Sequence, residues 1–383
     1  MSQEKPVIHK GLEGIYVCES SISVIYGDVG KLYYRGYSIE DLAEHSCYEE
    51  VTYLLLYGKL PTRRELDDFK KTLVENRDLP DVVLDFLKKV PKNAHPMEVL
   101  RSAVSMLGHW DPEPEDNSLE ALGRKAIRIT AKMPCIVAAF NRFREGKEYV
   151  PPNPNLGHAA NFLYMLNGKE PDEFEAKTMD VCLILYAEHG MNASAFAAIV
   201  TAATLSDMYS AIVSGIGTLR GPLHGGANEM AMREFMKVGD PSKAEEYVLE
   251  KLRKKERIMG FGHRVYKAYD PRAKIFRRYA EEMAKRKGGE IKKLYDIALK
   301  MEEVAIRELG AKKILTNVDY WMGIPAYALG IPIDLYTPIF AISRVAGWSA
   351  HVLEYVAQNR LIRPRQYYVG PIDLEYVPID KRG

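Results

Sequence analysis

The stretch GHRVYKAYDPRAK, residues 262–274, gathers histidine, arginine and lysine side chains in one short run. The whole chain is balanced, with 53 Lys and Arg against 52 Asp and Glu, so this positive charge is local. Asp270 can cap a helix that starts at Pro271, which places Arg272 in the first turn, where the helix dipole disfavours a cation. A helix N-terminus joined by a guanidinium can bind a carboxylate or a phosphate, which predicts an anionic ligand. The alternative is a solvated basic helix end that Asp270 neutralises.

A second segment, GPLHGGANE, places His224 beside two glycines, Gly225 and Gly226. Glycines remove side-chain cover and let a ligand approach the backbone closely. The segment therefore predicts a histidine that meets a ligand, and the alternative is a turn with a surface histidine.

A third segment, NVDYWMG, sets Asp319 among apolar side chains. Apolar surroundings make a carboxylate harder to ionise and more basic, which suits a general base, although Asp319 could equally cap a helix beginning at Tyr320. Arg344 lies in the apolar run AISRVAGWSAHVLEYV, where a buried guanidinium needs an anion, either a ligand or a structural salt-bridge partner. Arg363, in RPRQ, belongs to a basic segment that solvent exposure would also explain.

Several common functions are excluded by absent motifs. The sequence has no G-x-x-x-x-G-K-[ST], no H-E-x-x-H and no G-x-S-x-G, and Gly260-Phe-Gly262 lacks a third glycine. A pI of about 7.6 argues against a nucleic-acid-binding protein. The cysteines lack zinc-ligand spacing, and we interpret them as reduced core residues of a cytoplasmic protein: Cys18, Cys47, Cys135 and Cys182. No signal peptide is evident, and the longest apolar run, 181–187, is too short to span a membrane.

The elements that must position these residues are mainly helical. ISVIYGDVGKLYYRGY predicts a hairpin of two short strands that turns between Gly27 and Gly30. The rest lacks regular strand-helix alternation, which predicts an all-α protein with a small N-terminal β-hairpin. Loops are predicted at 111–116 and 151–155.

Helix starts and ends can be predicted from capping residues. The expected signals are a helix from Ser38 to Gly58, capping boxes at Thr62 with Glu65 and at Ser242 with Glu245, and helices that open with proline after Asp270 and after Thr337. At 383 residues the chain is long for one core. We expect a large helical domain, 1–222 and 332–383, with an inserted smaller domain, 223–331.

Taken in order, the motifs resemble the citrate synthase family along nearly the whole chain. They are LYYRGYSIEDL, AEHGMNAS, GPLHGGANE, GFGHRVYKAYDPRA, NVDYWMG, ISRVAGWSAH and RPRQYYVG. The sequence is similar to the short form, without an added N-terminal regulatory domain. The resemblance implies a citrate synthase fold with a large and a small helical domain that close on substrate.

The resemblance also implies an activity, the condensation of acetyl-CoA with oxaloacetate and hydrolysis of the resulting thioester to citrate. Its catalytic residues would be His224, which stabilises the enol or enolate of acetyl-CoA, His263, which polarises the oxaloacetate carbonyl, and Asp319, the base. Because acid and base act on opposite partners, no metal and no permanently bound cofactor would be needed.

The anions predicted above would then be the substrates. Oxaloacetate would be held by His189, Arg272 and Arg344, with Arg363 reaching in from the second subunit of a homodimer. Coenzyme A would meet the segment Ile258, Met259, Gly260, Phe261 and Gly262, together with Lys267, Lys312 and Lys313. Gly190 is a departure, because many family members have an acidic residue there.

Two other functions stay open. A 2-methylcitrate synthase would use propionyl-CoA with the same residues, and one methylene of pocket space discriminates by only about 1–3 kcal/mol. A catalytically silent helical protein that binds CoA would not need an acid and a base. No nucleic-acid or membrane partner is expected.

Overall fold

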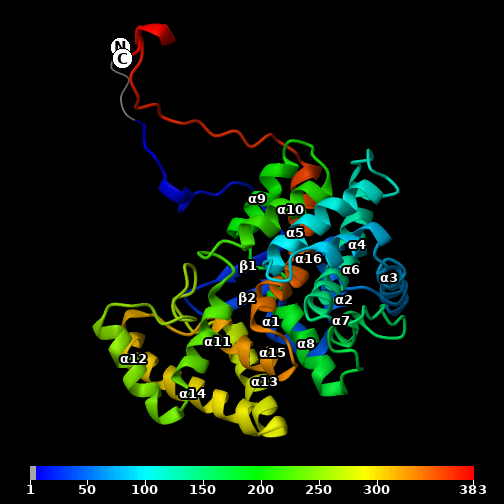
Figure 1. Cartoon of the computed structure of the whole chain (residues 1–383), viewed down its shortest axis with the longest axis vertical. Helices are drawn as coiled ribbons and strands as arrows, with labels where there is room; N and C mark the ends of the chain where they lie inside the picture. Colours follow the sequence, from blue (N-terminus) through cyan, green and yellow to red (C-terminus); the bar gives the residue numbers. More distant parts are fainter. Residues whose placement is uncertain (1–5) are drawn as a thin grey trace.

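The computed structural model describes residues 6–383, and helices make up most of it (Figure 1). The first half of the chain contains α1 (Ile39–His45), α2 (Tyr48–Tyr57), α3 (Arg63–Glu75), α4 (Asp81–Lys89), α5 (Pro96–Leu107), α6 (Leu119–Arg144), α7 (His158–Asn167) and α8 (Glu173–Tyr186). The second half contains α9 (Ala193–Ala202), α10 (Met208–Leu219), α11 (Ala227–Val238), α12 (Ala244–Arg253), α13 (Pro271–Lys287), α14 (Gly289–Leu309), α15 (Val318–Ala328) and α16 (Tyr336–Ala357). The predicted all-α class is confirmed.

A small antiparallel sheet precedes the helices, with strands β1 (Ser23–Tyr26), β2 (Lys31–Tyr34) and β3 (Tyr37–Ser38) in the order β1-β2-β3. The predicted hairpin is present, and β3 adds a third strand. The turn between β1 and β2 packs closely against the loop between α12 and α13. A Cβ at Gly27 would clash with the Val265 carbonyl oxygen, and one at Gly30 would lie 2.6 Å from the Tyr269 carbonyl oxygen. The Lys267 N–H also donates to the Gly27 oxygen at 3.0 Å. The sheet therefore supports that loop.

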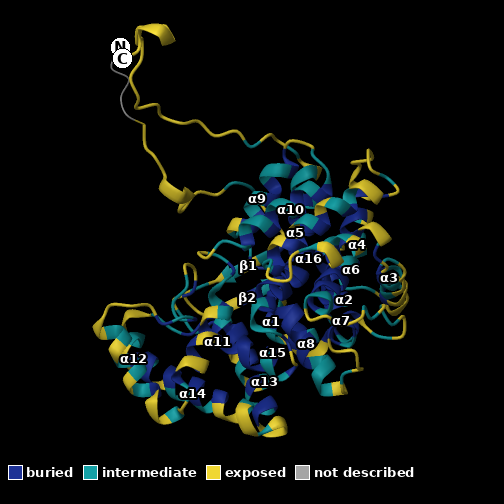
Figure 2. Cartoon of the chain, in the orientation of Figure 1, coloured by how far each residue is buried: buried dark blue, intermediate teal, exposed yellow. Residues whose placement is uncertain are grey.

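The core is organised around α16, which packs against α2, α6, α8, α9 and α10. Every residue of α16 from 336 to 352 is buried, and Figure 2 shows this part of the molecule in dark blue. A helix that is buried on every side is typical of the core of a large protein. Arg344 stands in the middle of it, so its charge is held where burial is costly. Within residues 6–383, no helix is long and apolar enough to cross a membrane.

The predicted single helix from Ser38 to Gly58 is wrong, because α1 and α2 are separate helices. Ser38 caps α1 through the Asp41 N–H, and Gly58 ends α2 at a φ of 77°. Between them Cys47 is extended, and the Tyr48 N–H donates to the Asp180 carboxylate at 2.9 Å. A partner 132 residues away thus stabilises the break.

The other helix-start predictions had mixed outcomes. The capping box of Thr62 with Glu65 and the Asp270 cap before Pro271 are confirmed. The box of Ser242 with Glu245 is wrong, because Asp240 caps a short 3-10 turn there and α12 starts at Ala244 without a side-chain cap. Two loops occupy 111–116 and 151–155 as predicted. The last long helix starts one residue before Thr337, which is inside α16.

Candidate active site

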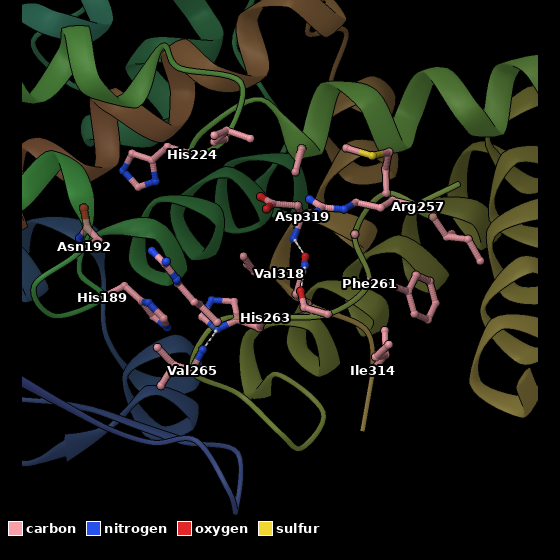
Figure 3. Close-up of a pocket in the computed structure, with 18 of the residues that line it drawn as sticks. His189, Asn192, His224, Arg257, Phe261, His263, Val265, Ile314, Val318 and Asp319 are labelled. Carbon is pink, nitrogen blue, oxygen red and sulfur yellow. Dashed lines mark hydrogen bonds between the residues drawn. The ribbon is translucent and has the colours of Figure 1, made fainter. Parts of the chain in front are cut away.

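A cavity of about 870 Å³ brings together residues from both halves of the chain (Figure 3). Eleven of the predicted site residues line it: six with ionisable side chains, His189, His224, His263, Arg272, Asp319 and Arg344, and the five of the segment 258–262. In Figure 3 the histidines lie at one end of the cavity, and Phe261 and Ile314 lie toward the other. The volume is within the usual range for a small-molecule site.

The backbone around His263 fixes both the position and the tautomer of its ring. Residues 260–262 pair with the segment before α15, since the Gly262 N–H donates to the Leu315 oxygen at 2.8 Å and the Asn317 N–H donates to the Gly260 oxygen at 2.9 Å. The Nδ1 atom of His263 accepts from the Val265 N–H at 3.0 Å and from the Tyr266 N–H at 3.1 Å. A neutral ring therefore carries its proton on Nε2.

Burial, together with the nearby Arg272 charge, lowers the pKa of His263 to about 4. At neutral pH the ring is thus a neutral N–H donor rather than an imidazolium. Such a group can polarise a carbonyl oxygen in the cavity.

His224 lies in the loop between α10 and α11, held by a second hydrogen-bond network. Its Nε2 atom is 2.8 Å from Ser194 Oγ, and Trp348 Nε1 donates to this Oγ at 3.0 Å. Burial lowers the pKa of His224 to about 4, with a smaller contribution from the Arg344 charge. The Ser194 N–H donates to Nε2 at 3.3 Å, and the Ser194 hydroxyl donates to Asn192 Oδ1 at 2.7 Å. The proton of the neutral ring is therefore on Nδ1, the nitrogen without a partner in the described chain. His224 can then donate to a ligand oxygen.

Asp319 is in the first turn of α15, and the alternative that it caps this helix is wrong. The cap is Asn317, whose Oδ1 accepts from the Asp319 N–H at 3.0 Å. The side chain of Asp319 instead lines the cavity, where Tyr186 Oη donates to its Oδ1 at 3.3 Å. Burial raises the pKa of Asp319 to about 6, and the Arg272 charge opposes part of that rise. The carboxylate is therefore a stronger base than an exposed one and is still ionised at neutral pH.

The two buried arginines differ in how their charge is compensated. Arg272 forms a two-point ion pair with Asp270, with Nε to Oδ1 at 3.0 Å and Nη2 to Oδ2 at 2.8 Å. The solvated helix end is thus wrong as an alternative, since Arg272 is 2% exposed, but the neutralising role of Asp270 is confirmed. Nη1 of Arg272 has no partner among residues 6–383, so it can still bind a ligand.

Arg344 has no carboxylate within ion-pair distance in the described chain. Its Nε donates to the Tyr186 carbonyl oxygen at 2.6 Å, and its guanidinium lies 4.6 Å from the Phe340 ring centroid. Burial lowers the pKa of Arg344 to about 10, so it remains charged at neutral pH. The alternative of a structural salt bridge is therefore not supported. A buried, unpaired guanidinium beside a cavity favours an anionic ligand.

His189 follows α8 and completes this end of the cavity. Its ring is 5.2 Å from that of His263, and its Nε2 lies 3.3 Å from the Tyr266 hydroxyl. Burial lowers the pKa of His189 well below its usual value, and the Arg272 charge adds to the effect. Gly190, at a φ of 61°, turns the chain so that its N–H donates to Ser23 Oγ at 3.1 Å. His189 is therefore a neutral donor or acceptor fixed next to His263.

The structure separates the remaining predicted residues from the cavity. Lys267, Lys312, Lys313 and Arg363 are exposed and do not line it. Sequence reasoning did not name several residues that do, among them Arg257, Arg264 and Ile314. Arg257 directly precedes the segment 258–262, so its position beside that loop was the available signal. No group of three metal-ligating side chains occurs within residues 6–383.

Comparisons with known proteins show which family the chain belongs to. The family described as "Citrate synthase, C-terminal domain" matches residues 11–365. A citrate synthase of Haloferax volcanii is 50% identical over 98% of this chain and 99% of its own, and a 2-methylcitrate synthase of Shewanella oneidensis is 41% identical over the whole of both chains. The structure of a ternary complex of carboxymethyl coenzyme A and oxaloacetate with citrate synthase from Thermoplasma acidophilum superposes with a TM-score of 0.94, at 39% identity, over 99% of this chain and 100% of that one. The chain belongs to the citrate synthase family.

Proposed function

We propose that this citrate synthase condenses acetyl-CoA with oxaloacetate and releases citrate and coenzyme A through the cavity described above. The observation that carries the proposal is the placement of one base and two neutral imidazole donors around a common space lined by two buried arginines. A relative of known structure binds oxaloacetate and a coenzyme A analogue together.

The first step is the formation of a carbon nucleophile. Asp319 takes a proton from the methyl group of acetyl-CoA, and His224 donates to the thioester oxygen as negative charge develops there. A methyl group next to a thioester is a very weak acid, so the base alone is not sufficient. One well-placed donor contributes about 3–4 kcal/mol to such a step.

The second step joins the two substrates. Arg272, Arg344 and His189 hold the two carboxylates of oxaloacetate, and the Nε2–H of His263 polarises its ketone. The enol carbon attacks this ketone, and the new alkoxide takes its proton at His263. Hydrolysis of the thioester then releases coenzyme A.

The free thiol of coenzyme A gives a direct assay. The purified protein is expected to release thiol only when oxaloacetate and an acyl-CoA are both present, with a higher kcat/KM for acetyl-CoA than for propionyl-CoA. A preference for propionyl-CoA would make the chain a 2-methylcitrate synthase, and no release from folded protein would support a silent CoA-binding protein.

We also propose that the enzyme is a homodimer in which Arg363 completes the site of the partner. The segment after α16 runs away from the helical body, and its apolar side chains are exposed (Figures 1 and 2). Tyr368 is 60% exposed, Leu374 75% and Tyr376 79%. Exposed apolar side chains in such number are typical of a surface that another chain covers.

Complementation between two inactive variants tests whether Arg363 acts in the site of the partner subunit. Asp319→Asn and Arg363→Gln are co-expressed with different tags, and each alone is expected to be nearly inactive. In a mixed dimer, one site has both Asp319 and the Arg363 of the other chain, so purified mixed dimers should regain about half of the wild-type activity per dimer. If Arg363 acts within its own chain, the mixed dimers stay inactive.

The domain division, 1–222 and 332–383 against 223–331, and a cytoplasmic location also stay predictions. The packing of α11, α13 and α14 against α15 and of α12 against α14 supports a separate small domain. The cavity lies between this group and residues such as His189 and Arg344, so a relative motion of the two parts would close it around the substrates.

A further inference from the structure

Tyr186, the last residue of α8, is fully buried directly behind the site. Its ring packs between Phe276 and Phe340, with centroid distances of 5.6 and 4.1 Å. It does not line the cavity, and no catalytic step described above uses it. A buried tyrosine hydroxyl nevertheless needs a hydrogen-bond partner, and the identity of that partner is informative.

Two polar groups of Tyr186 contact two different residues of the site. The hydroxyl donates to Asp319 Oδ1 at 3.3 Å, and the carbonyl oxygen accepts from Arg344 Nε at 2.6 Å. One rigidly packed residue therefore touches both the base for acetyl-CoA and the unpaired cation for oxaloacetate.

The contact with Asp319 is selective between the two carboxylate oxygens. Among residues 6–383, the Tyr186 hydroxyl is the one hydrogen-bond donor to this carboxylate, and it reaches Oδ1. Oδ2 is left without a protein partner. An anchored Oδ1 restricts rotation of the carboxylate group and keeps Oδ2 available to accept a proton from substrate.

We propose that Tyr186 is a positioning residue of the condensation, which orients the Asp319 carboxylate through its hydroxyl and sets the place of Arg344 through its carbonyl oxygen. This inference rests on the proposed role of Asp319 as the base. A fixed distance between base and cation matters because the enol carbon must form within reach of the bound ketone.

Removal of the hydroxyl has a predictable electrostatic effect. The groups that act on Asp319 are Arg272 and Asp270 of the α13 start, Arg344 of α16 and the Tyr186 hydroxyl. A donor to a carboxylate favours the ionised form, so its loss raises the pKa of Asp319 further above its ordinary value. The pKa of Tyr186 is itself well above its usual value because of burial, so the hydroxyl stays protonated and keeps its role as donor.

The test is Tyr186→Phe, which keeps the packed ring and removes only the hydroxyl. We expect kcat for acetyl-CoA at pH 7 to fall about 10-fold and the acid limb of kcat/KM to move up by about one pH unit, while the oxaloacetate KM stays within about twofold. Activity should recover in part toward pH 9. An unmoved acid limb, with or without a loss of kcat, would overturn the proposal.

Tyr336→Phe is a matched control. The Tyr336 hydroxyl is also buried, and it donates to the Gly323 oxygen on α15, the helix that carries Asp319, at 2.8 Å. This variant loses a hydrogen bond to the same helix without touching the carboxylate, so its acid limb should stay in place. A shift of similar size in both variants would mean that the helix as a whole had moved, which contradicts a specific role for Tyr186.

Asp319→Asn separates this inference from the proposed function. If Asp319→Asn keeps wild-type activity, the base has been assigned wrongly. If Asp319→Asn is inactive and Tyr186→Phe has the wild-type pH profile, only the positioning role fails.

Discussion

Replacement of Asp319 by asparagine is expected to lower kcat by about 1,000-fold, because a positioned general base contributes roughly that factor. Asparagine keeps the shape of the side chain but cannot accept the methyl proton. Thiol release under saturating acetyl-CoA and oxaloacetate measures the loss. Asp334→Asn is the control, since Asp334 pairs with Arg144 outside the cavity and should keep wild-type kcat.

The same substitution should leave stability at pH 7 equal or higher. Folding raises the pKa of Asp319 to about 6, so the folded chain holds this proton more tightly than the unfolded chain. Asp319 therefore contributes most to the free energy of unfolding below pH 4, and this contribution is lost as the pH rises through 6. Thermal unfolding at pH 5 and pH 7 checks this, and a large drop in Tm at pH 7 would contradict it.

The activity of the wild-type enzyme should follow the same titration. Because the base must be ionised, kcat/KM is expected to fall as the pH drops below about 6. His224 and His263, with pKa values near 4, remain neutral donors over this range. A profile that is flat down to pH 5 would exclude Asp319 as the base.

Replacement of Arg344 by leucine is the second large expected effect. The KM for oxaloacetate should rise about 100-fold or more, since loss of one partner of a buried charge pair costs roughly 2–5 kcal/mol. Lysine at this position keeps the charge but loses the fork geometry, so its effect should be smaller. The KM for acetyl-CoA should change much less, and steady-state kinetics with each substrate varied separately would measure the difference.

A matched arginine variant tests whether position matters. Arg144 is also partly buried, but it pairs with Asp334 and lies outside the cavity. Arg144→Leu should reduce stability and leave the oxaloacetate KM unchanged. An Arg344→Leu enzyme whose oxaloacetate KM matches that of Arg144→Leu would remove Arg344 from the site.

Local signals in the sequence predicted local structure well. The hairpin turn at Gly27, the capping box at Thr62 and the Asp270 cap all depend on residues within a few positions of one another. The break between α1 and α2 was missed because Asp180, far along the chain, accepts from the first N–H of α2. Tertiary partners of this kind leave no local pattern.

The site was predictable where a residue type conflicts with its surroundings. Arg344 within an apolar run and Asp319 among apolar side chains were singled out on that basis, and both line the cavity. A cation at the start of a helix, Arg272, also predicted an anionic partner. One such partner belongs to the chain itself, because Arg272 forms an ion pair with Asp270. Tyr186 gave no signal, because a tyrosine in an apolar run is ordinary until its partner across 133 positions is known.

Exchange of the acetyl methyl protons of acetyl-CoA with D₂O tests the separate roles of Asp319, His224 and His263 most directly. The assay uses a four-carbon 2-hydroxy dicarboxylate in place of oxaloacetate, which can fill the arginine site but has no ketone to attack. The wild type and His263→Ala should incorporate deuterium, whereas Asp319→Asn and His224→Ala should not. Wild-type exchange by Asp319→Asn, or loss of exchange in a His263→Ala enzyme that still binds the dicarboxylate, would contradict the mechanism.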